Sequence, residues 1–483
     1  MASSRELTTQ RLTTLPLLAA GAPQFFDSAD YATRITTTTN GILDRVAPPG
    51  CVPLDVVHVF GSAKERGVAH GKLLSTRVMH FVNVDLPNFY VSEVAGLADN
   101  KWLPKWLQAD IRNIANKDAP KAFELALGWL QGVQHKYNEA SAAAIFDELD
   151  GVAEGVCDEA VAAGTACDVA ELTKTLRNVN VLPDLIRMQC SMLGAWGSAT
   201  PMGTLLQLRS LDFGGGPFAN NSILIVHHPP AMPDGTSQSF ASLSWPGFAG
   251  AVTGFNPTLS LSEKVNDVTG GPKPKGTYHG QTTALVLRDV LQFAQANEAS
   301  AVGAKEKAAA IMRGANRTWG VWIGVGDAHS EQMDVVKYEE ASAVTYNTTT
   351  LPSLTSQPAV ADVVYVDKHP QPSPDKVMPD AVKALAAASN ITAHSVAALG
   401  EETQSGDVHI AIYDYRPSKG CGRRLFSVYL ALGSTDANGT FHGPGGRYAW
   451  AAPYVRFEAG DLFSQMPPGS DAKAAVVEEL SCA

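Results

Sequence analysis

The sequence predicts an α+β fold made of packed layers, and three observations lead to this prediction. Residues from about Leu107 to Ala163 place apolar side chains three and four positions apart, which is the spacing of amphipathic helices. After Cys190 the chain breaks into short segments that are rich in β-branched and aromatic residues and bounded by turn residues, as strands are. One clear helix, TTALVLRDVLQFAQAN, interrupts these strands. Helices followed by many strands around an internal helix favour an α+β sandwich.

The expected elements divide the chain into three segments. Residues 1–40 are dense in threonine and are interpreted as a loosely attached extension, either a weak signal or a disordered segment. A helix-rich segment at 41–189 opens with VPLDVVHVFGS, which has the alternation of a strand. A β-rich segment follows at 190–483, and 41–483 together form one domain. The segments expected to be strands there are TLLQLRSLDF, NSILIVHH, SFASLSWPGF, GAVTGF, TLSLSEKV, GVWIGVGD, MDVVKYEE, DVVYVDKH, DVHIAIYDYRP, RLFSVYLALGS and YVRFEAGD.

The composition argues against several classes of function. With 37 basic and 48 acidic residues the formal net charge is −11, and no segment concentrates lysine and arginine, so we expect no nucleic-acid partner. The 12 histidines lack the paired spacing of a zinc site, such as H-E-x-x-H, so we expect no metal. No apolar run after the N-terminal segment approaches the roughly 20 residues that span a bilayer, so we expect no integral membrane segment.

Cysteines, sequons and the N-terminal segment leave the cellular compartment open. The six cysteines suggest no disulfide framework, although a bridge between Cys157 and Cys167 is compatible with their spacing. The opening residues combine arginines with a short, mildly apolar run, which matches a signal peptide poorly. The protein is secreted or lysosome-like if this segment is a signal, and cytoplasmic otherwise. Five N-x-[ST] sequons favour secretion only slightly, at Asn220, Asn316, Asn347, Asn390 and Asn438.

The stretch MQCSMLGAWGSATPMGTLLQLRSLDFGGG, which begins at Met188, holds the strongest candidate for chemistry. A thiol attacks a carbonyl as its thiolate, so a nucleophilic cysteine needs a base or a cationic neighbour. Cleavage before Cys190 creates such a base, because an α-amine titrates at roughly 7.7 to 8.0. From the next strand, Asp212 would hold the new ammonium group and Arg209 would favour the thiolate. In the structural alternative, Cys190 is a small buried residue and R-x-x-D is an ion pair.

The same stretch resembles the processed N-terminus of the N-terminal-nucleophile cysteine amidases, a family that includes isopenicillin-N acyltransferase (peptidase C45-like), acid ceramidase and the N-acylethanolamine acid amidase. Cys190, Ser191 and RSLDFG are similar to the ceramidase-type pattern, in which Ser or Thr follows the cysteine and R-N-[LM]-D-[FW]-G comes later. Further blocks resemble the family in the same order, from about Val52 to Asp461: ERGVAHGKLL, FDELDGVAEGV, DVAELTKTLRNVN, LSWPGFAGAVTGFNPTLSLSEKVND and VHIAIYDYRPSKGCGRRLFSVYLALG.

This resemblance implies the four-layer αββα sandwich of the N-terminal-nucleophile hydrolases and a precursor that cleaves itself. Cleavage between Gln189 and Cys190 gives an α chain and a β chain that stay associated. Cys190 then cleaves a non-peptide carboxamide, of the N-acyl amine or N-acyl amino acid type, through an acyl-thioester. The implied partner is a small-molecule amide substrate, and no cofactor is needed. By the same resemblance, Asp212 orients the amine, Arg209 holds the thiolate or the substrate, and Asn266 contributes to the oxyanion hole or to substrate binding.

One position departs from the family pattern. The family's oxyanion-hole asparagine lies in a [HV]-x-[ST]-N motif, and the best match here, VVYVDKHP, has Asp367 at that position. An ionised aspartate cannot donate a hydrogen bond, and losing such a donor costs about 2.7 to 4 kcal/mol of transition-state stabilisation. Three explanations are open: Asp367 is protonated, Asn256 or Asn266 supplies the donor, or the enzyme is weak or altered. An acyltransferase using the same thioester and a catalytically silent lipid- or amide-binding protein are the alternatives for the whole chain.

Other chemically capable residues have structural interpretations that we favour. His70 precedes Gly71 in a strand-to-helix turn, where packing or capping is the more common role. Asn256 precedes Pro257, as turn asparagines do. The tryptophans next to the expected strands are core residues by default, although they could line an acyl pocket: Trp245, Trp319 and Trp322.

Overall fold

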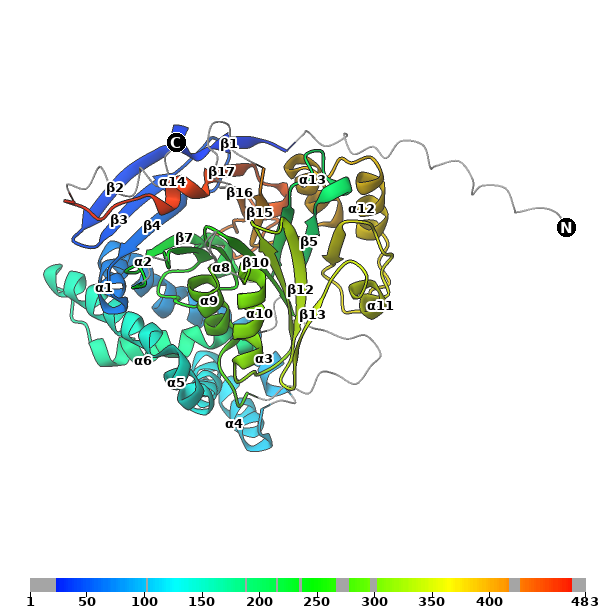
Figure 1. Ribbon diagram of the computed structural model, residues 1–483. Coiled ribbons are helices and arrows are strands. Elements are labelled where there is room, and N and C mark those ends of the chain that lie inside the picture. The colour runs from blue at the N-terminus through cyan, green and yellow to red at the C-terminus, as the bar shows by residue number, and fades with distance from the viewer. Residues whose placement is uncertain are drawn as a thin grey trace.

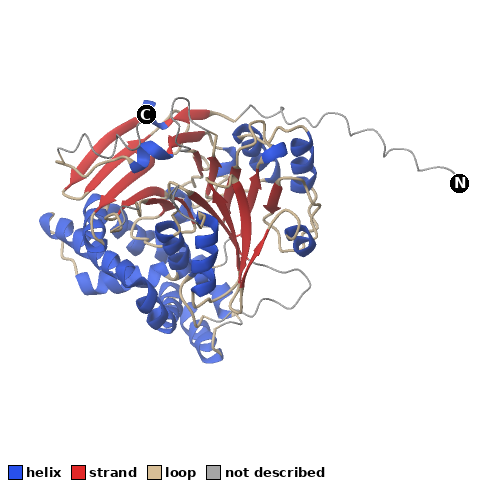
Figure 2. Ribbon diagram, viewed as in Figure 1, coloured by secondary structure: helices blue, strands red, loops and turns tan. Residues whose placement is uncertain are grey.

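The computed structural model of the protein is a mixed α+β structure built on two β-sheets (Figures 1 and 2). The structure describes residues 23–100, 103–186, 189–213, 216–233, 237–265, 278–295, 302–416 and 426–470. The seven-stranded sheet has, in spatial order, β1 (Phe25–Asp27), β17 (Tyr454–Glu458), β16 (Ser427–Leu432), β15 (His409–Asp414), β6 (Leu206–Asp212), β5 (Gln189–Ala195) and β14 (Val363–Val366). The ten-stranded sheet has β13 (Ala343–Tyr346), β12 (Gln332–Tyr338), β11 (Val321–Asp327), β10 (Leu259–Val265), β9 (Thr253–Phe255), β8 (Phe240–Ser244), β7 (Ile223–His228), β4 (Leu54–Phe60), β3 (Gly41–Val46) and β2 (Ala32–Thr38).

The two sheets pack face to face. An apolar cluster joins side chains of both, among them Met192 of β5, Leu224 of β7 and Val428 of β16. Polar side chains also cross the interface, since Gln207 of β6 donates to Ser262 of β10 at 2.8 Å. Such buried pairs fix how one sheet lies on the other, because an unmatched polar group there would be costly.

Helices cover the outer faces of both sheets, as Figure 2 shows. Two hydrophobic clusters join the ten-stranded sheet to the helices on its outer face. These helices are α1 (Ala63–Leu73), α2 (Ser75–His80), α3 (Leu86–Ala98), α4 (Lys105–Ala115), α5 (Ala119–Ala162), α6 (Val169–Asn180), α7 (Leu182–Leu185), α8 (Gly216–Asn220), α9 (Thr283–Phe293) and α10 (Ala304–Gly314). On the seven-stranded sheet lie α12 (Val377–Ala387) and α13 (Ala393–Thr403). The remaining short helices are η1 (Ser28–Asp30), η2 (Phe81–Asp85), η3 (Gly197–Ala199), α11 (Leu351–Thr355), η4 (Ala449–Ala451) and α14 (Ala459–Phe463).

Helices α1 and α5 cross at a contact made of glycines. Gly67 and Gly71 of α1 lie against Gly151 and Gly155 of α5. A Cβ atom built on Gly67 would lie 2.0 Å from the carbonyl oxygen of Glu148, which is far inside any real contact distance. Only glycine therefore allows the two backbones to approach this closely. These glycines belong to the blocks ERGVAHGKLL and FDELDGVAEGV, so part of that pattern has a packing role.

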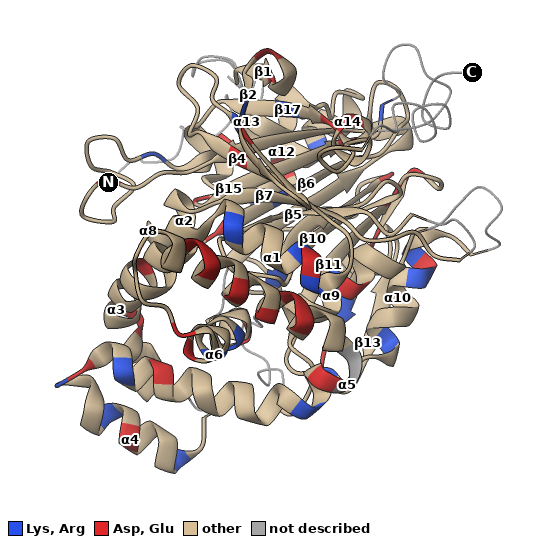
Figure 3. Cartoon of the chain, turned by 90° about the vertical axis from the view of Figure 1, so that its left-hand side faces the viewer, with Lys and Arg blue, Asp and Glu red and all other residues tan. Residues whose placement is uncertain are grey.

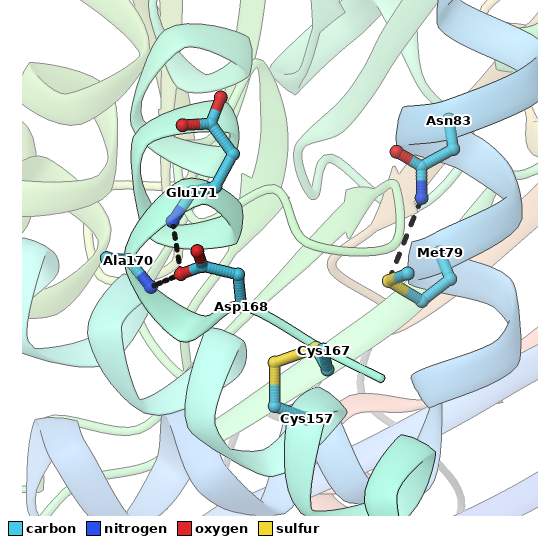
Figure 4. Close-up of a disulfide and its surroundings, with 7 residues drawn as sticks. All are labelled: Met79, Asn83, Cys157, Cys167, Asp168, Ala170 and Glu171. Atoms are coloured by element: carbon cyan, nitrogen blue, oxygen red, sulfur yellow. Dashed lines mark hydrogen bonds between the residues drawn. A yellow bond between two sulfur atoms is a disulfide. The ribbon is translucent and has the colours of Figure 1, made fainter. Parts of the chain in front are cut away.

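Cys157 of α5 and Cys167 form a disulfide (Figure 4). The bridge joins the end of α5 to the start of α6, where Asp168 accepts hydrogen bonds from the backbone N–H groups of Ala170 and Glu171. The pairing that the cysteine spacing left open is therefore present. It fixes the turn between two helices of the segment that precedes Cys190.

The structure confirms the α+β class and most of the expected strands, and it differs in two respects. Residues 25–38, part of the expected extension, form β1 and β2, which pair with β17 and β3. Threonine suits such exposed strands because its branched side chain fits a pleated surface. Helices α10, α12 and α13 lie where no element was expected.

None of the described helices is both long and apolar enough to cross a membrane. On the face drawn in Figure 3, basic and acidic residues are interspersed along α4 and α5.

Candidate active site

Cys190 is the second residue of β5, a strand that lies between β6 and β14 inside the seven-stranded sheet. Its side chain is fully buried, whereas that of Gln189 is exposed. The peptide bond that we expect to be cleaved therefore joins an exposed residue to a buried one. Residues 187 and 188, which precede it, lie outside the described part of the chain.

The strand register brings the sequence-predicted residues together around Cys190. Strands β5 and β6 are antiparallel, with Gln189 opposite Asp212 and Met192 opposite Arg209. Paired residues share a face, and successive residues alternate between faces. Arg209 therefore lies on the same face as Cys190, toward the ten-stranded sheet, and Asp212 lies on the other face. Both come from the neighbouring strand, as the sequence analysis expected.

The guanidinium of Arg209 is fully buried and reaches from one sheet to the other. Its Nε atom donates to Thr253 Oγ1 at 3.0 Å, and its Nη1 atom donates to the carbonyl oxygen of Ser210 at 2.7 Å. The Nη2 atom lies 3.5 Å from Glu263 Oε2. Three partners thus fix a positive charge beside Cys190, and two of them, Thr253 and Glu263, were not singled out from the sequence.

Burial and charge set the protonation of the two buried acids next to Arg209. Burial raises the pKa of the Cys190 thiol to about 12, although the charge and hydrogen bond of Arg209 oppose the rise. The thiol is therefore protonated at neutral pH in the uncleaved chain and has to give up its proton as it attacks. Burial also raises the pKa of Glu263 to about 7, again against the charge of Arg209.

The carboxylate of Asp212 is held by the loop that follows α13. Ser405 Oγ donates to Asp212 Oδ2 at 2.7 Å, and the backbone N–H of Gly406 donates to Oδ1 at 2.6 Å. Burial raises the pKa of Asp212, and these two donors and the charges of Lys368 and Arg209 oppose the rise. Nothing in the sequence pattern pointed to Ser405 or Gly406, because they lie almost 200 positions after Asp212.

His409 of β15 is a further buried residue that the sequence analysis did not single out. Residue Leu211 lies between it and Cys190 across the sheet, on the same face. Its Nε2 atom lies 2.9 Å from Thr253 Oγ1, so Thr253 contacts both His409 and Arg209. Burial holds the pKa of His409 well below its ordinary value, which keeps the ring neutral. The sequence did hold one signal for this residue: in the alternating run HIAIYD, His409 is a polar residue at a position that faces the interior.

Asp367 follows β14, the strand on the other side of β5. Its carboxylate accepts hydrogen bonds from the side-chain amides of Gln357 at 3.2 Å and Gln371 at 2.9 Å, and from the backbone N–H of His369 at 3.1 Å. A carboxylate that accepts three bonds is acting as an acceptor for its own loop. These contacts give Asp367 a structural role, and none of them supplies a donor for an oxyanion.

The two asparagines considered for the oxyanion hole have different outcomes. Asn256 is fully buried, and its Nδ2 atom donates to the carbonyl oxygen of Leu291 while its Oδ1 atom accepts from the N–H groups of Thr258 and Leu259. Its amide therefore closes the turn between β9 and β10 and anchors it to α9, which agrees with the turn role favoured from the sequence. Asn266 lies outside the described residues.

The family-like blocks around His70 and Glu148 form a buried ionic network. Burial by itself raises the pKa of Glu148, but the charges of Arg288 and Arg66 outweigh it and hold that pKa well below the usual range. The carboxylate lies 2.9 Å from Arg66 and 2.5 Å from Arg288. Burial lowers the pKa of His70 to about 4, and its Nε2 atom accepts from the N–H of Gly247 at 3.1 Å. His70 lies inside α1, in its last turn, and not in the expected strand-to-helix turn, while the packing role favoured for it fits these contacts.

One group among the described residues could hold a metal ion. Ligand atoms of Asp367, His369 and Asp375 all lie within 4.8 Å of one another. Carboxylates and imidazole are usual ligands of divalent cations. The hydrogen bonds from two glutamines already account for the buried Asp367, so the group has a structural explanation without an ion.

Tryptophans 245, 319 and 322 are buried in the core clusters, in line with their expected packing role. Trp319 also lines a cavity of about 20 Å³ together with Glu263 and Asp184. This volume suffices for roughly one water molecule. The cavity is far too small for an acyl chain.

Comparison with known proteins adds similarity over nearly the whole chain. Protein dcd1A of Dictyostelium discoideum is 27% identical over 451 residues, which cover 89% of this chain and 90% of that protein. Protein dcd1B of the same organism is 28% identical over 450 residues, which cover 90% of this chain and 79% of that protein. No protein-family model matches the sequence. Neither name states an activity, so the function is argued from the residues around Cys190.

Proposed function

We propose that the protein is a self-processing cysteine amidohydrolase that cleaves a non-peptide carboxamide through an acyl-thioester on Cys190. The observation that carries this proposal is the register of β5 and β6. It supports a buried nucleophile next to the exposed Gln189, a buried guanidinium on the same face as the thiol, and a carboxylate at the strand end next to the Gln189–Cys190 bond. The residues resemble the N-terminal-nucleophile cysteine amidases at the same positions.

The arrangement of layers supports the same proposal. Two face-to-face sheets with helices on both outer faces are compatible with the four-layer αββα sandwich of N-terminal-nucleophile hydrolases. In such a fold the first residue of a central strand becomes a new N-terminus. Cys190 is the second residue of β5, so cleavage before it removes only one residue from the strand.

The proposed self-cleavage is an acyl shift followed by hydrolysis. Sγ of Cys190 attacks the carbonyl carbon of Gln189, the C–N bond between the two residues breaks, and the thiol proton moves to the departing nitrogen. Water then hydrolyses the thioester, which gives a carboxylate at Gln189 and restores the thiol. The α-amine of Cys190 is now free to act as a base, with a pKa near roughly 7.7 to 8.0. During turnover this amine can accept the proton of the Cys190 thiol, whose pKa is raised by burial.

During turnover the new amine acts first as a base and then as an acid. The amine accepts the thiol proton, Sγ attacks the substrate carbonyl, and the amine returns the proton to the departing nitrogen. Water cleaves the acyl-thioester and completes the cycle. Arg209 stabilises the thiolate, and Asp212 holds the ammonium form of the amine.

Denaturing electrophoresis tests the proposal. Cleavage gives an α chain of 189 residues and a β chain of the remaining 294, with masses of about 20 and about 31 kDa in proportion to 51.1 kDa for the whole chain. We expect both bands from the wild type and one band from Cys190→Ala. Cys51→Ala is the matched control, because Cys51 is the other described cysteine outside a disulfide, and it should still give two bands. A single wild-type band with no N-terminal cysteine detectable by end-sequencing would overturn the proposal.

A catalytically silent lipid- or amide-binding protein is the second candidate. It is favoured by the contacts of Asp367 and Asn256, because both side chains are committed to their own loops. Mass spectrometry of the β chain after incubation with a panel of N-acyl amines separates the two candidates. An acyl adduct on Cys190 supports the enzyme, and a cleaved chain without any adduct or product supports the silent protein.

A further inference from the structure

We propose that Ser405 is a positioning residue for this reaction, which together with Gly406 aims the carboxylate of Asp212 at the new α-amine of Cys190. The inference rests on the proposed function and deepens it. Neither residue belongs to the RSLDFG stretch or to the strands that carry it. Both come from the short connection between α13 and β15.

The two oxygens of Asp212 are each held by one donor of this connection. Ser405 is almost fully buried, and its hydroxyl lies 2.7 Å from Oδ2, while the N–H of Gly406 lies 2.6 Å from Oδ1. One bond to each oxygen fixes both the position and the plane of a carboxylate. Without these two bonds the carboxylate of Asp212 would lose its fixed orientation about its side-chain bonds.

Gly406 fits its place because of its backbone conformation. Its φ angle is +109°, a region that residues with a side chain rarely adopt, and an added Cβ atom would lie 2.3 Å from Ile410 Cγ1. The connection is also braced from outside, since the N–H of Trp450 donates to the carbonyl oxygen of Gly406 at 3.0 Å. The N–H that contacts Asp212 is therefore held in a fixed direction.

A hydroxyl chain links this carboxylate to the nucleophile's neighbour. Ser405 Oγ also lies 2.7 Å from Oγ of Ser191, the residue after Cys190. The hydroxyl of Ser405 is placed to donate to either oxygen but has a single hydrogen, and the carboxylate of Asp212, which can only accept, is the stronger acceptor. The chain Ser191 to Ser405 to Asp212 therefore runs along the strand end where the amine would form.

The charges that face Asp212 come from every element around it. Arg209 lies on β6 beside it, the thiol of Cys190 lies on β5, and Lys368 lies after β14 with its Nζ atom 2.6 Å from the carbonyl oxygen of Gln404. Asp407, next to Gly406, carries a pKa raised to about 6, by burial first and then by the charge of Asp212. Ser405 and Gly406 are thus the neutral donors in a cluster of opposed charges.

Removing the Ser405 hydroxyl shifts this balance in a known direction. The hydrogen bond favours the ionised carboxylate, so its loss raises the pKa of Asp212. The amine is released when the C–N bond breaks, and an ionised Asp212 that holds it as ammonium keeps the acyl group from returning to nitrogen before water hydrolyses the thioester. The acid side of the pH–rate profile of self-cleavage therefore moves to higher pH. A hydrogen bond to a charged group is strong enough for a move of about one pH unit, which slows the reaction about 10-fold on the acid side.

The experiment follows the rate of self-cleavage across acid to alkaline pH. Chains made by cell-free translation are transferred to buffers of different pH, and the β chain is quantified on gels over time. We compare wild type with Ser405→Ala, with Ser405→Thr, which keeps the hydroxyl, and with Ser222→Ala. Ser222 is a matched buried serine that donates to the carbonyl oxygen of Phe218 at 3.0 Å. Only Ser405→Ala should show the shifted acid limb, and Ser405→Thr should restore it.

The outcomes separate this inference from the proposed function. A cleaved wild type with an unchanged profile for Ser405→Ala overturns the positioning role alone. A loss of rate that is equal at every pH, and that Ser405→Thr does not repair, also overturns it, because a structural role alone gives that pattern. A wild type that is never cleaved overturns the proposed function and the positioning role with it.

Discussion

At the scale of single residues, the protonation of buried acids next to Arg209 is the feature with the most direct consequences. Glu263 has a pKa raised to about 7, and Cys190 has a pKa raised to about 12, both chiefly by burial. The same guanidinium opposes both rises. The charge of Arg209 therefore acts on two acids at once. Of these two, Glu263 is the one whose charge changes near neutral pH.

Glu263→Gln tests this pH dependence. The pKa of Glu263 is higher in the folded protein than its usual value near 4.3, so the folded state binds more protons between about pH 4.3 and about pH 7. The stability that Glu263 contributes is complete below about pH 4.3 and is lost as the pH rises through about 7. We expect urea unfolding to show that Glu263→Gln gains stability relative to wild type between about pH 5 and about pH 8, by up to about 1.4 kcal/mol per pH unit. If the variant and the wild type differed by the same free energy of unfolding at about pH 5 and about pH 8, this pH dependence would be wrong.

Asp367→Asn tests the residue that departs from the family pattern. The amide offers one acceptor oxygen where the carboxylate offers two, so at least one of the amides of Gln357 and Gln371 loses its partner. We expect the free energy of unfolding to fall by about 1 to 3 kcal/mol, with self-cleavage unchanged. Chemical denaturation and the two-band gel measure these outcomes. Faster cleavage or turnover in Asp367→Asn would mean that this position does face the oxyanion.

At the scale of elements, the glycine contact between α1 and α5 is the most constrained feature. A side chain at Gly67 would meet the backbone of α5 at 2.0 Å, so the helices would have to separate. Gly128, on the same helix α5, has no atom within 4 Å of an added Cβ. The two positions differ in packing and share a helical backbone.

Gly67→Ala and Gly128→Ala should therefore change stability in opposite directions. The first forces overpacking, and we expect a loss of about 1 to 3 kcal/mol. The second only replaces glycine by a better helix former, and we expect a gain of about 0.5 to 1 kcal/mol. Thermal and urea unfolding check both values. If both variants were stabilised, the close approach of the two backbones would be wrong.

Much of the fold was within reach of the sequence, because its signals are local. The strands around Arg209 and His409 show plain alternation, and the internal helix over Thr283–Phe293 shows a clear apolar face. The strand β2 was missed, because a threonine-rich, exposed strand lacks an apolar face to reveal it. The helices α10, α12 and α13 were missed as well, although the buried residues of α10 recur at helical spacing, at Ala304, Ala308 and Met312.

The candidate site was only partly predictable. Cys190, Arg209 and Asp212 lie within one stretch of the chain and could be found together. Glu263 and Ser405 reach them through the packing of the two sheets and the return of the chain after α13, and neither event leaves a local pattern. Asp367 was found by motif, but its glutamine partners appear only in three dimensions.

At the scale of the whole molecule, Glu148 connects parts of the chain that are far apart. It contacts Arg66 of α1 and Arg288 of α9 and lies 3.4 Å from His227 of β7. Because the charges of both arginines hold its pKa well below the usual range, its contribution is present above about pH 4.3 and is lost only as the pH falls far below that value. The network therefore survives mild acid.

Glu148→Gln should be strongly destabilising. It leaves two buried guanidinium groups without their carboxylate, and we expect a loss of about 3 to 5 kcal/mol in the free energy of unfolding at neutral pH. Glu154→Gln is the matched control on the same helix, because Glu154 is an exposed partner of Lys64, and it should cost no more than about 1 kcal/mol. Similar losses for both variants in urea unfolding would refute a buried network.

The ten-stranded sheet carries one further consequence, which follows from the parallel pairing of β4 with β7. Strands β2, β3 and β4 precede Cys190 in the chain, and β7 and the strands beyond it follow Cys190. A gene split into two at this point would therefore encode two polypeptides that each end in a bare sheet edge. Such edges recruit other strands, so each half made alone should aggregate. Made together in one cell, the halves should pair with each other and stay soluble.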